Sequence, residues 1–167
     1  MSEFGLNRAR LSRFMSISGS PGQPVAHSRL HIRRAGAGDH AAILALMQAL
    51  ELAYPAMDLS CFWVAELDGT LVAAAELKDL DTCSLLSCVG VREDLQGQGI
   101  GQALVDRISR EARSAVYLYT LVPDFFRKVG YRDARSLPPG LPPRTIYGCR
   151  DCNPSLCLCL VRTGNGS

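Results

Sequence analysis

The segment from Val89 to Leu104 constrains the fold more than any other part of the chain. An apolar, strand-like run leads to three alternating glycines, Gly97, Gly99 and Gly101, and then directly into a helical pattern. Glycine permits left-handed backbone angles and close approach, and the first N–H groups of a helix have no partner inside the helix. The segment therefore predicts a strand–turn–helix unit whose helix N-terminus binds an anion. A glycine-rich turn that only joins a strand to a helix is the alternative.

The glycine spacing excludes two common nucleotide motifs. No Lys, Ser or Thr follows Gly101, so the pattern of a P-loop is not met. A dinucleotide fingerprint needs its third glycine two positions later and an acidic residue about 20 residues downstream, and Glu111 and Asp124 fit that place poorly. The alternating glycines thus favour a diphosphate site of another kind.

Hydrophobic periodicity predicts strands and helices along the rest of the chain. Asp68-Gly69 is a strong hairpin turn, Asp39 is expected to cap the first helix, and Gly130 is expected to end the last helix, which begins near Pro123. In order, we expect a strand at 29–34, a helix to about 54, strands at 61–67, 71–77 and 85–91, a helix at 99–114, a strand at 115–120, a short helix at 124–129, a short strand from 131 and a last strand at 156–161. This order predicts an α+β sandwich with a mixed central sheet and helices on both faces.

Length and composition indicate one ordinary domain. The chain has 167 residues, of which 47% are hydrophobic and 20% charged, which suffices to bury a core. We place that domain at residues 29–162. No apolar run approaches the roughly 20 residues that cross a bilayer, and a net charge of +2 is too small to suggest nucleic acid as a partner. We therefore expect no membrane and no nucleic-acid partner.

Residues 1–28 differ from the rest of the chain. They begin with several arginines and continue with small, polar and proline residues, a composition that favours disorder. We expect a disordered extension, either native or an expression remnant. A transit peptide is the alternative, because the segment is rich in Arg and Ser and has a single acid, Glu3.

The chain has seven cysteines, an odd number, and no secretory signal pattern. This combination favours a reduced, cytoplasmic protein. Four of the thiols lie in a C-terminal segment, residues 149–159, at Cys149, Cys152, Cys157 and Cys159. A Cys-x2-Cys pair suits zinc, but the second pair is badly spaced. Thiol redox chemistry or soft-metalloid binding is a second possibility, and unlinked structural cysteines are the prediction we favour.

Two motifs in this order of elements resemble those of the GNAT superfamily of acetyl-CoA-dependent N-acyltransferases. Gln96-Gly97-Gln98-Gly99-Ile100-Gly101 is similar to its Gln/Arg-x-x-Gly-x-Gly/Ala motif, and Phe125-Phe126-Arg127-Lys128-Val129-Gly130-Tyr131 to its Phe-Tyr-x-Lys-x-Gly-Phe signature. Within the superfamily the chain resembles small bacterial amino-acid N-acetyltransferases of the N-acetylglutamate synthase and arsenic-resistance types. Leu85-Leu86-Ser87-Cys88-Val89, Leu118-Tyr119-Thr120, Leu137-Pro138 and the cysteine-bearing tail carry this narrower similarity.

The resemblance implies a site for acetyl-CoA. Main-chain groups of Val89, Gly90 and Val91 would pair with the pantetheine arm like an added strand. Phe125 and Phe126 would pack against its thioester end, although core packing also explains these residues, and Arg127 or Lys128 would approach the outer phosphate. The N–H groups that would hold the diphosphate are those of Gln96, Gly97, Gln98, Gly99, Ile100, Gly101 and Gln102.

The same resemblance leaves the acid and base of the reaction unassigned. Amine attack on a thioester needs a base for the ammonium proton and an acid for the departing thiolate. The usual Glu aligns with Leu85 and the usual Tyr with Phe126, while the arginine that binds a substrate carboxylate aligns with Ser87. Tyr119 is the preferred candidate for the acid, with a buried, hydrogen-bonded Tyr as the alternative. Ordered water, Tyr131, Glu76 and Asp81 are further substitutes.

We therefore expect an N-acetyltransferase that moves the acetyl group of acetyl-CoA to a primary amine of a small molecule, for which an amino acid is one option. A non-catalytic acyl-CoA sensor module and a protein or peptide N-acetyltransferase are the alternatives. The loops at 53–60 and 138–143 are expected to shape the amine pocket. The apolar last strand offers an edge through which a homodimer could form.

Overall fold

The computed structural model describes residues 29–149 and 153–164. Its strands form one seven-stranded sheet in the order β1-β2-β3-β4-β5-β7-β6. The elements are β1 (Leu30–Arg34), α2 (His40–Ala49), β2 (Phe62–Leu67), β3 (Thr70–Asp79), β4 (Ser84–Val91), α3 (Ile100–Glu111), β5 (Val116–Thr120), α4 (Pro123–Arg127), β6 (Arg132–Asp133) and β7 (Leu158–Arg162), with short 3-10 turns η3 (Ala37–Asp39), η4 (Leu59–Cys61), η5 (Glu93–Leu95) and η6 (Arg144–Tyr147). The predicted order of strands and helices is confirmed.

The sheet is mixed, as expected. Strands β1 to β4 form an antiparallel meander, β4 and β5 run parallel, and β7 lies antiparallel between β5 and β6. The predicted β2–β3 hairpin turns at Asp68 and Gly69, whose φ angles of 51° and 78° are both left-handed. Two such residues define the turn that matches the natural twist of paired strands.

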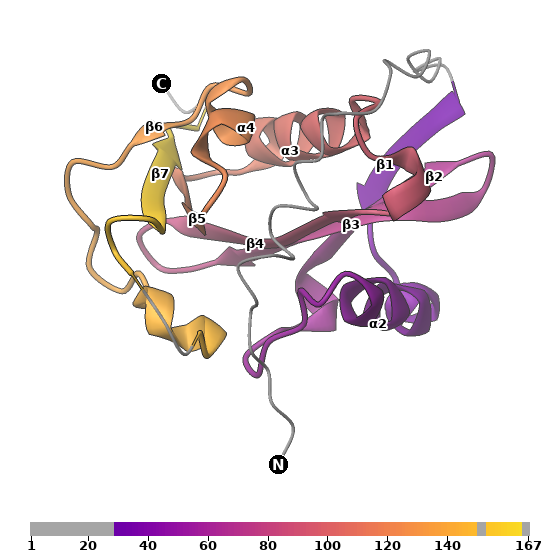
Figure 1. The fold of residues 1–167 in the computed structure, drawn as a ribbon, viewed down its shortest axis with the longest axis horizontal. Helices are drawn as coiled ribbons and strands as arrows, with labels where there is room; N and C mark the ends of the chain where they lie inside the picture. The colour runs from indigo at the N-terminus through magenta and orange to yellow at the C-terminus, as the bar shows by residue number, and fades with distance from the viewer. Residues whose placement is uncertain (1–28, 150–152, 165–167) are drawn as a thin grey trace.

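Helices cover both faces of the sheet (Figure 1), which confirms the predicted layers. Helices α3 and α4 lie on one face, and α2 and η6 lie on the other, which we call the α2 face. Alternating residues of the central strands point to the two sides. On β3, Ala73, Ala75 and Leu77 join the core beneath α3, whereas Ala74 joins the smaller core beneath α2.

Two local predictions need correction. Asp39 precedes α2 but makes no side-chain cap; its carboxylate accepts hydrogen bonds from Arg33 at 2.7 and 3.0 Å and from the Gly36 N–H at 2.7 Å. A guanidinium is a stronger partner than a single helix N–H. Helix α3 ends at Glu111 rather than near Ser114, because Ala112 is already extended, with ψ of 135°.

Strands β4 and β5 diverge soon after they begin. Only Ser84 with Val116 and Leu85 with Tyr117 are paired. Beyond this point β4 contains a bulge, because Ala74 pairs with Gly90 while Glu76 pairs with Ser87. Cys88, at the bulge, has a left-handed φ of 51°. Bulges bend the strand that contains them, so β4 leaves β5 here, and we call the resulting gap between the two strands the strand opening.

Candidate active site

The turn that connects β4 to α3 has the backbone that its glycines predict. Gly97 and Gly99 have left-handed φ angles of 78° and 86°. A Cβ at either position would meet no protein atom within 4 Å, so both glycines border open space. The side-chain amide of Gln96 donates to the Val91 carbonyl at 2.9 Å, which ties the turn to the end of β4. We call residues 96–101 the glycine turn.

Helix α3 begins at the glycine turn with free donors. Its first backbone hydrogen bond runs from the Ala103 N–H to the Gly99 carbonyl at 3.0 Å, so the preceding N–H groups have no acceptor within the helix. The helix dipole adds partial positive charge at this end. Gly101 is helical and serves close packing instead, because a Cβ there would lie 3.2 Å from Phe125 Cζ and 3.3 Å from Val91 Cγ2. A helix start of this kind can bind an anion, so the anion site at the glycine turn stays a prediction that this backbone allows.

The second predicted signature lies on α4, next to the glycine turn. Phe126 is buried in the core, and its ring meets Phe125 and Tyr131 edge-on at centroid distances of 4.9 and 5.8 Å. Arg127 is held by Asp124 and Asp133. Lys128 is exposed at the end of α4. Of the two cations expected near the outer phosphate, Lys128 is thus the more available.

The C-terminal end of β4 lies beneath the C-terminal end of α2. Gly90 faces this end so closely that a Cβ would lie 2.7 Å from Leu50 Cδ1, 2.8 Å from Leu52 Cδ1 and 3.2 Å from Met47 Cε. Leu85, where a glutamate is usual in the resemblance, is fully buried. No carboxylate is therefore supplied by β4 itself.

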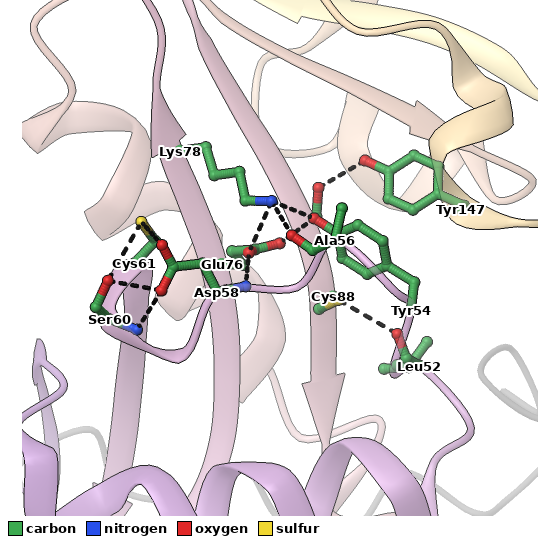
Figure 2. A network of polar contacts seen from close by, with 11 residues as sticks. Leu52, Tyr54, Ala56, Asp58, Ser60, Cys61, Glu76, Lys78, Cys88 and Tyr147 are labelled. Carbon is green, nitrogen blue, oxygen red and sulfur yellow. Dashed lines mark hydrogen bonds and ion pairs between the residues drawn. The ribbon is translucent and has the colours of Figure 1, made fainter.

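A polar network occupies the α2 face beside the strand opening (Figure 2). Glu76 of β3 is fully buried. Its two carboxylate oxygens accept from the Tyr54 hydroxyl at 2.6 Å and from the Asp58 N–H at 2.7 Å. Lys78 Nζ lies 3.4 Å from Glu76 and donates to the Tyr54 hydroxyl at 3.0 Å and to the Ala56 carbonyl. Burial raises the pKa of Glu76. Burial and the hydrogen bond to this carboxylate raise the pKa of Tyr54. The loop at 53–60 is thereby tied to β3.

Tyr147 of η6 spans the strand opening on the same face. Its hydroxyl shares a hydrogen bond of 2.6 Å with Ser87 Oγ of β4. Its ring lies 4.8 Å from the ring of Tyr54 and 6.3 Å from that of Tyr119 on β5. Burial raises the pKa of Tyr147. A single side chain thus contacts both diverging strands and the loop that covers them.

Tyr119, the predicted acid, lies on β5 at the edge of this cluster. Its hydroxyl donates to the Pro142 carbonyl at 2.8 Å, which places the loop at 138–143 against the strand end. The Arg144 guanidinium lies 5.2 Å from the centre of the Tyr119 ring. Burial raises the pKa of Tyr119. In this conformation its proton is committed to the Pro142 carbonyl.

The other residues considered as substitutes for the usual acid and base lie in different parts of the fold. Tyr131 lies on the opposite face, where its hydroxyl shares a hydrogen bond of 2.7 Å with Ser109 Oγ. Asp81 is exposed between β3 and β4. Glu76 and Tyr119 are therefore the two candidates that the fold brings to the α2 face beside the strand opening.

The cysteine tail is described only in part. Cys149, Cys157 and Cys159 are each partly buried, whereas Cys152 lies outside the described residues, as does the predicted extension at 1–28. Within residues 29–149 and 153–164, no three His, Cys, Asp or Glu side chains are grouped closely enough to hold a metal ion. In the same ranges, every helix is too short or too polar to cross a membrane.

Comparisons with known proteins agree with this geometry. Residues 58–133 match the model of the acetyltransferase (GNAT) domain, a stretch that includes β3, β4, the glycine turn and α4. This part of the chain is therefore similar to a GNAT acetyltransferase domain. The predicted GNAT fold, with its mixed sheet and helices, is confirmed as well.

Solved structures show the same fold. N-acetylglutamate synthase from Neisseria gonorrhoeae, complexed with coenzyme A and L-arginine, is 26% identical, with a TM-score of 0.64 over 82% of this chain. This chain spans only 34% of that enzyme's length. A Mycobacterium tuberculosis protein in complex with CoA is 22% identical, with a TM-score of 0.60 over 80% of this chain and 98% of its own. A GNAT-family acetyltransferase from Staphylococcus aureus is 17% identical, with a TM-score of 0.61 over 80% of this chain and 98% of its own.

Sequence reasoning missed several residues of the α2 face. Tyr147 follows a proline-rich loop, and no local pattern places it against Ser87, which lies 60 positions earlier. The sequence predicts that Tyr54 lies at the end of a helix, and it gives no sign of the hydrogen bond to Glu76 that the structure shows. The one available signal was Lys78, since Glu76 and Lys78 at alternate positions of a strand must share a face.

Proposed function

We propose that this chain is an acetyl-CoA-dependent N-acetyltransferase that acts on the primary amine of a small molecule. The observation that carries the proposal is the glycine turn, with two left-handed glycines and the free N–H groups of α3, placed directly after a strand that diverges from its parallel neighbour. Two oxygen-rich phosphates suit this end of the helix. The complexes of N-acetylglutamate synthase and of the M. tuberculosis protein with CoA support the same cofactor.

The proposed path of the cofactor follows from the direction of β4. With the diphosphate at residues 96–102, the pantetheine arm extends back along Val91, Gly90 and Val89 and pairs with their main-chain groups. The thioester then lies near the bulge at Cys88 and the strand opening. Lys128 approaches the outer phosphate. Phe125 forms an apolar wall, and Phe126, which is buried in the core, supports it from beneath.

The amine is proposed to enter from the α2 face, where the loop at 53–60 and η6 converge. Tyr119 is our candidate for the acid that protonates the departing thiolate, after its hydroxyl releases the Pro142 carbonyl. The Tyr119→Phe variant tests this role. An unaltered pH profile and turnover would show that Tyr119 is not the acid.

The test of the function is release of free CoA thiol from acetyl-CoA in the presence of a panel of small amines. We expect release that depends on the amine, together with an acetylated amine found by mass spectrometry. Tight binding of acetyl-CoA without any amine-dependent release would contradict the proposal and favour a sensor module. Release only with peptide amines would favour a protein acetyltransferase.

A matched pair of glycine variants links the activity to the glycine turn. Gly97 and Gly69 have the same φ of 78°, and a Cβ at either position meets nothing within 4 Å. Gly97→Ala and Gly69→Ala therefore introduce the same backbone strain, about 1 kcal/mol each. We expect Gly97→Ala, and not Gly69→Ala, to raise the KM for acetyl-CoA by about tenfold. Strain at Gly97 would turn a backbone N–H away from the diphosphate, and the loss of one hydrogen bond to a charged group has about this effect.

A further inference from the structure

Glu76 is the one carboxylate that is buried among the described residues. A buried carboxylate is costly unless several donors compensate it. Here the donors are the Tyr54 hydroxyl, the Asp58 N–H and Lys78 Nζ. None of these three hydrogen-bond donors belongs to the backbone pairing between strands. They surround the Glu76 carboxylate on the α2 face in addition to the hydrogen bonds that hold the sheet together.

Of the side chains that contact the carboxylate, only Tyr54 has an oxygen that can accept a proton from a substrate, because the Lys78 ammonium has donors and no acceptor. Glu76 has no exposed surface, whereas Tyr54 retains 8%. The Tyr54 hydroxyl donates its proton to Glu76 Oε2 and accepts one hydrogen bond from Lys78. A hydroxyl oxygen has two acceptor positions, so one of them remains for a proton that arrives from outside the network.

The group lies next to the place where the thioester is expected. Glu76 pairs across the sheet with Ser87 of β4, and paired residues point to the same face. Ser87 lies two residues beyond Leu85, the last residue of β4 that pairs with β5. Tyr147 connects Ser87 to the ring of Tyr54. The Tyr54 ring and the strand opening are thus joined through one side chain.

We propose that Tyr54 and Glu76 together accept the proton of the ammonium substrate, with Tyr54 as the catalytic residue and Glu76 as the positioning residue behind it. This inference rests on the proposed acetyltransferase function. The ammonium N–H bond breaks as its proton moves to the Tyr54 oxygen, while the Tyr54 proton moves to Glu76 Oε2. The neutral amine then attacks the thioester carbonyl carbon, and the C–S bond breaks. The departing thiolate takes the proton of Tyr119, which recovers a proton as the new amide nitrogen loses its second one. Glu76 later returns its proton to solvent.

The charges around Glu76 suit such a role. Burial raises the pKa of the carboxyl above its ordinary value, which makes it a better proton acceptor, and the Lys78 ammonium, 3.4 Å away, acts against this rise. The titratable groups that face it are Tyr54, Asp58 and Cys61 from the loop, Lys78 from β3, Cys88 from β4 and Tyr147 from η6. Burial raises the pKa of Cys61 and Cys88, so these thiols stay neutral.

The experiment compares Glu76→Gln and Tyr54→Phe with the unmodified protein across pH, using two amines. For a strongly basic amine, which is protonated at pH 7, we expect each variant to lower kcat about 100-fold, the usual size of a general-base contribution. This loss should shrink as the pH approaches the amine's own pKa, because the free amine then needs no acceptor. An amine of low basicity, already neutral at pH 7, should be acetylated by both variants at nearly the original rate.

Glu66→Gln is the matched control. Glu66 is a partly buried glutamate on β2 that pairs with Arg33 and His31, away from β4, and its replacement should leave both pH profiles unchanged. The KM for acetyl-CoA and the thermal midpoint show whether each variant folds. If Glu76→Gln does not fold, Tyr54→Phe decides, since it keeps the ring and loses only the hydroxyl.

An equal loss of kcat for both amines at every pH would overturn the inference. The network would then serve only to hold the loop at 53–60 against β3. Failure of the proposed function looks different, because the unmodified protein would then release no thiol with any amine. A working unmodified protein whose variants retain its pH profile would contradict only the proton-acceptor role.

Discussion

Gly90 shows how one missing side chain determines the approach of a helix to a strand. It lies on β4 directly beneath the C-terminal end of α2, with the methyl groups of Leu50, Leu52 and Met47 filling the space of a Cβ. This contact is what allows the loop after α2 to reach across the sheet toward Glu76. The glycine is needed for space and not for a left-handed angle, in contrast to Gly97 and Gly99.

Gly90→Ala should therefore destabilise the fold. We expect the free energy of unfolding to fall by about 1–3 kcal/mol, as for other overpacked sites, measured by denaturant titration. Gly38→Ala is the control, because a Cβ at Gly38 meets nothing within 4 Å. An equal effect of the two substitutions would show that crowding against α2 is not the cause.

At the scale of elements, the junction between β1 and α2 depends on an acid rather than on a helix cap. Asp39 accepts hydrogen bonds from Arg33 and from the Gly36 N–H, and these bonds lower the pKa of Asp39 to about 2. A carboxyl whose pKa is lower in the folded state stabilises the fold above its ordinary pKa. The stabilisation is lost as the pH falls toward the folded value.

Asp39→Asn should accordingly lower the free energy of unfolding by about 1–2 kcal/mol at pH 7, the usual range for a hydrogen bond to a charged group. The difference from the unmodified protein should shrink between pH 5 and pH 3, as Asp39 becomes protonated in the unfolded chain. Urea titrations at several pH values measure it. A difference that is constant over this interval would contradict the ionic origin.

Elements with a local cause were predictable from the sequence. The hairpin at Asp68-Gly69 and the strand–turn–helix at the glycine turn follow from residues that are adjacent in the chain. The polar part of the site was not predictable in the same way. Tyr54 and Glu76 are 22 residues apart, and Ser87 and Tyr147 are 60 apart. Such contacts depend on how η6 and the loop after α2 pack on the finished sheet, which no residue pattern encodes.

At the scale of the whole molecule, the sheet consists of two parts with a weak seam. Strands β1 to β4 form one part and β5, β7 and β6 the other, and only two residue pairs join them. The shared core under α3 and the Tyr147 contacts supplement this seam. A cofactor arm that pairs with β4 inside the strand opening would bind the folded state only.

Acetyl-CoA should therefore stabilise the protein against heat in a concentration-dependent way. At a ligand concentration of about 100 Kd the expected gain is about 2.7 kcal/mol, seen as a rise of the thermal midpoint. Gly97→Ala should show a smaller rise of the midpoint at the same concentration of acetyl-CoA. Gly69→Ala should show the same rise as the unmodified protein. A midpoint that does not respond to acetyl-CoA would rule out binding at this seam.

The bulge at Cys88 also has a consequence for the parity of β4. Side chains on a regular strand alternate every two residues, yet Leu86 and Val89, three apart, both join the core under α3. Ser87 and Gly90, also three apart, share the opposite face. Deleting Cys88 alone would restore this alternation and leave Val89 and Val91 facing the core under α3. The extra residue therefore sets where β4 bends away from β5, and not which of its side chains are buried.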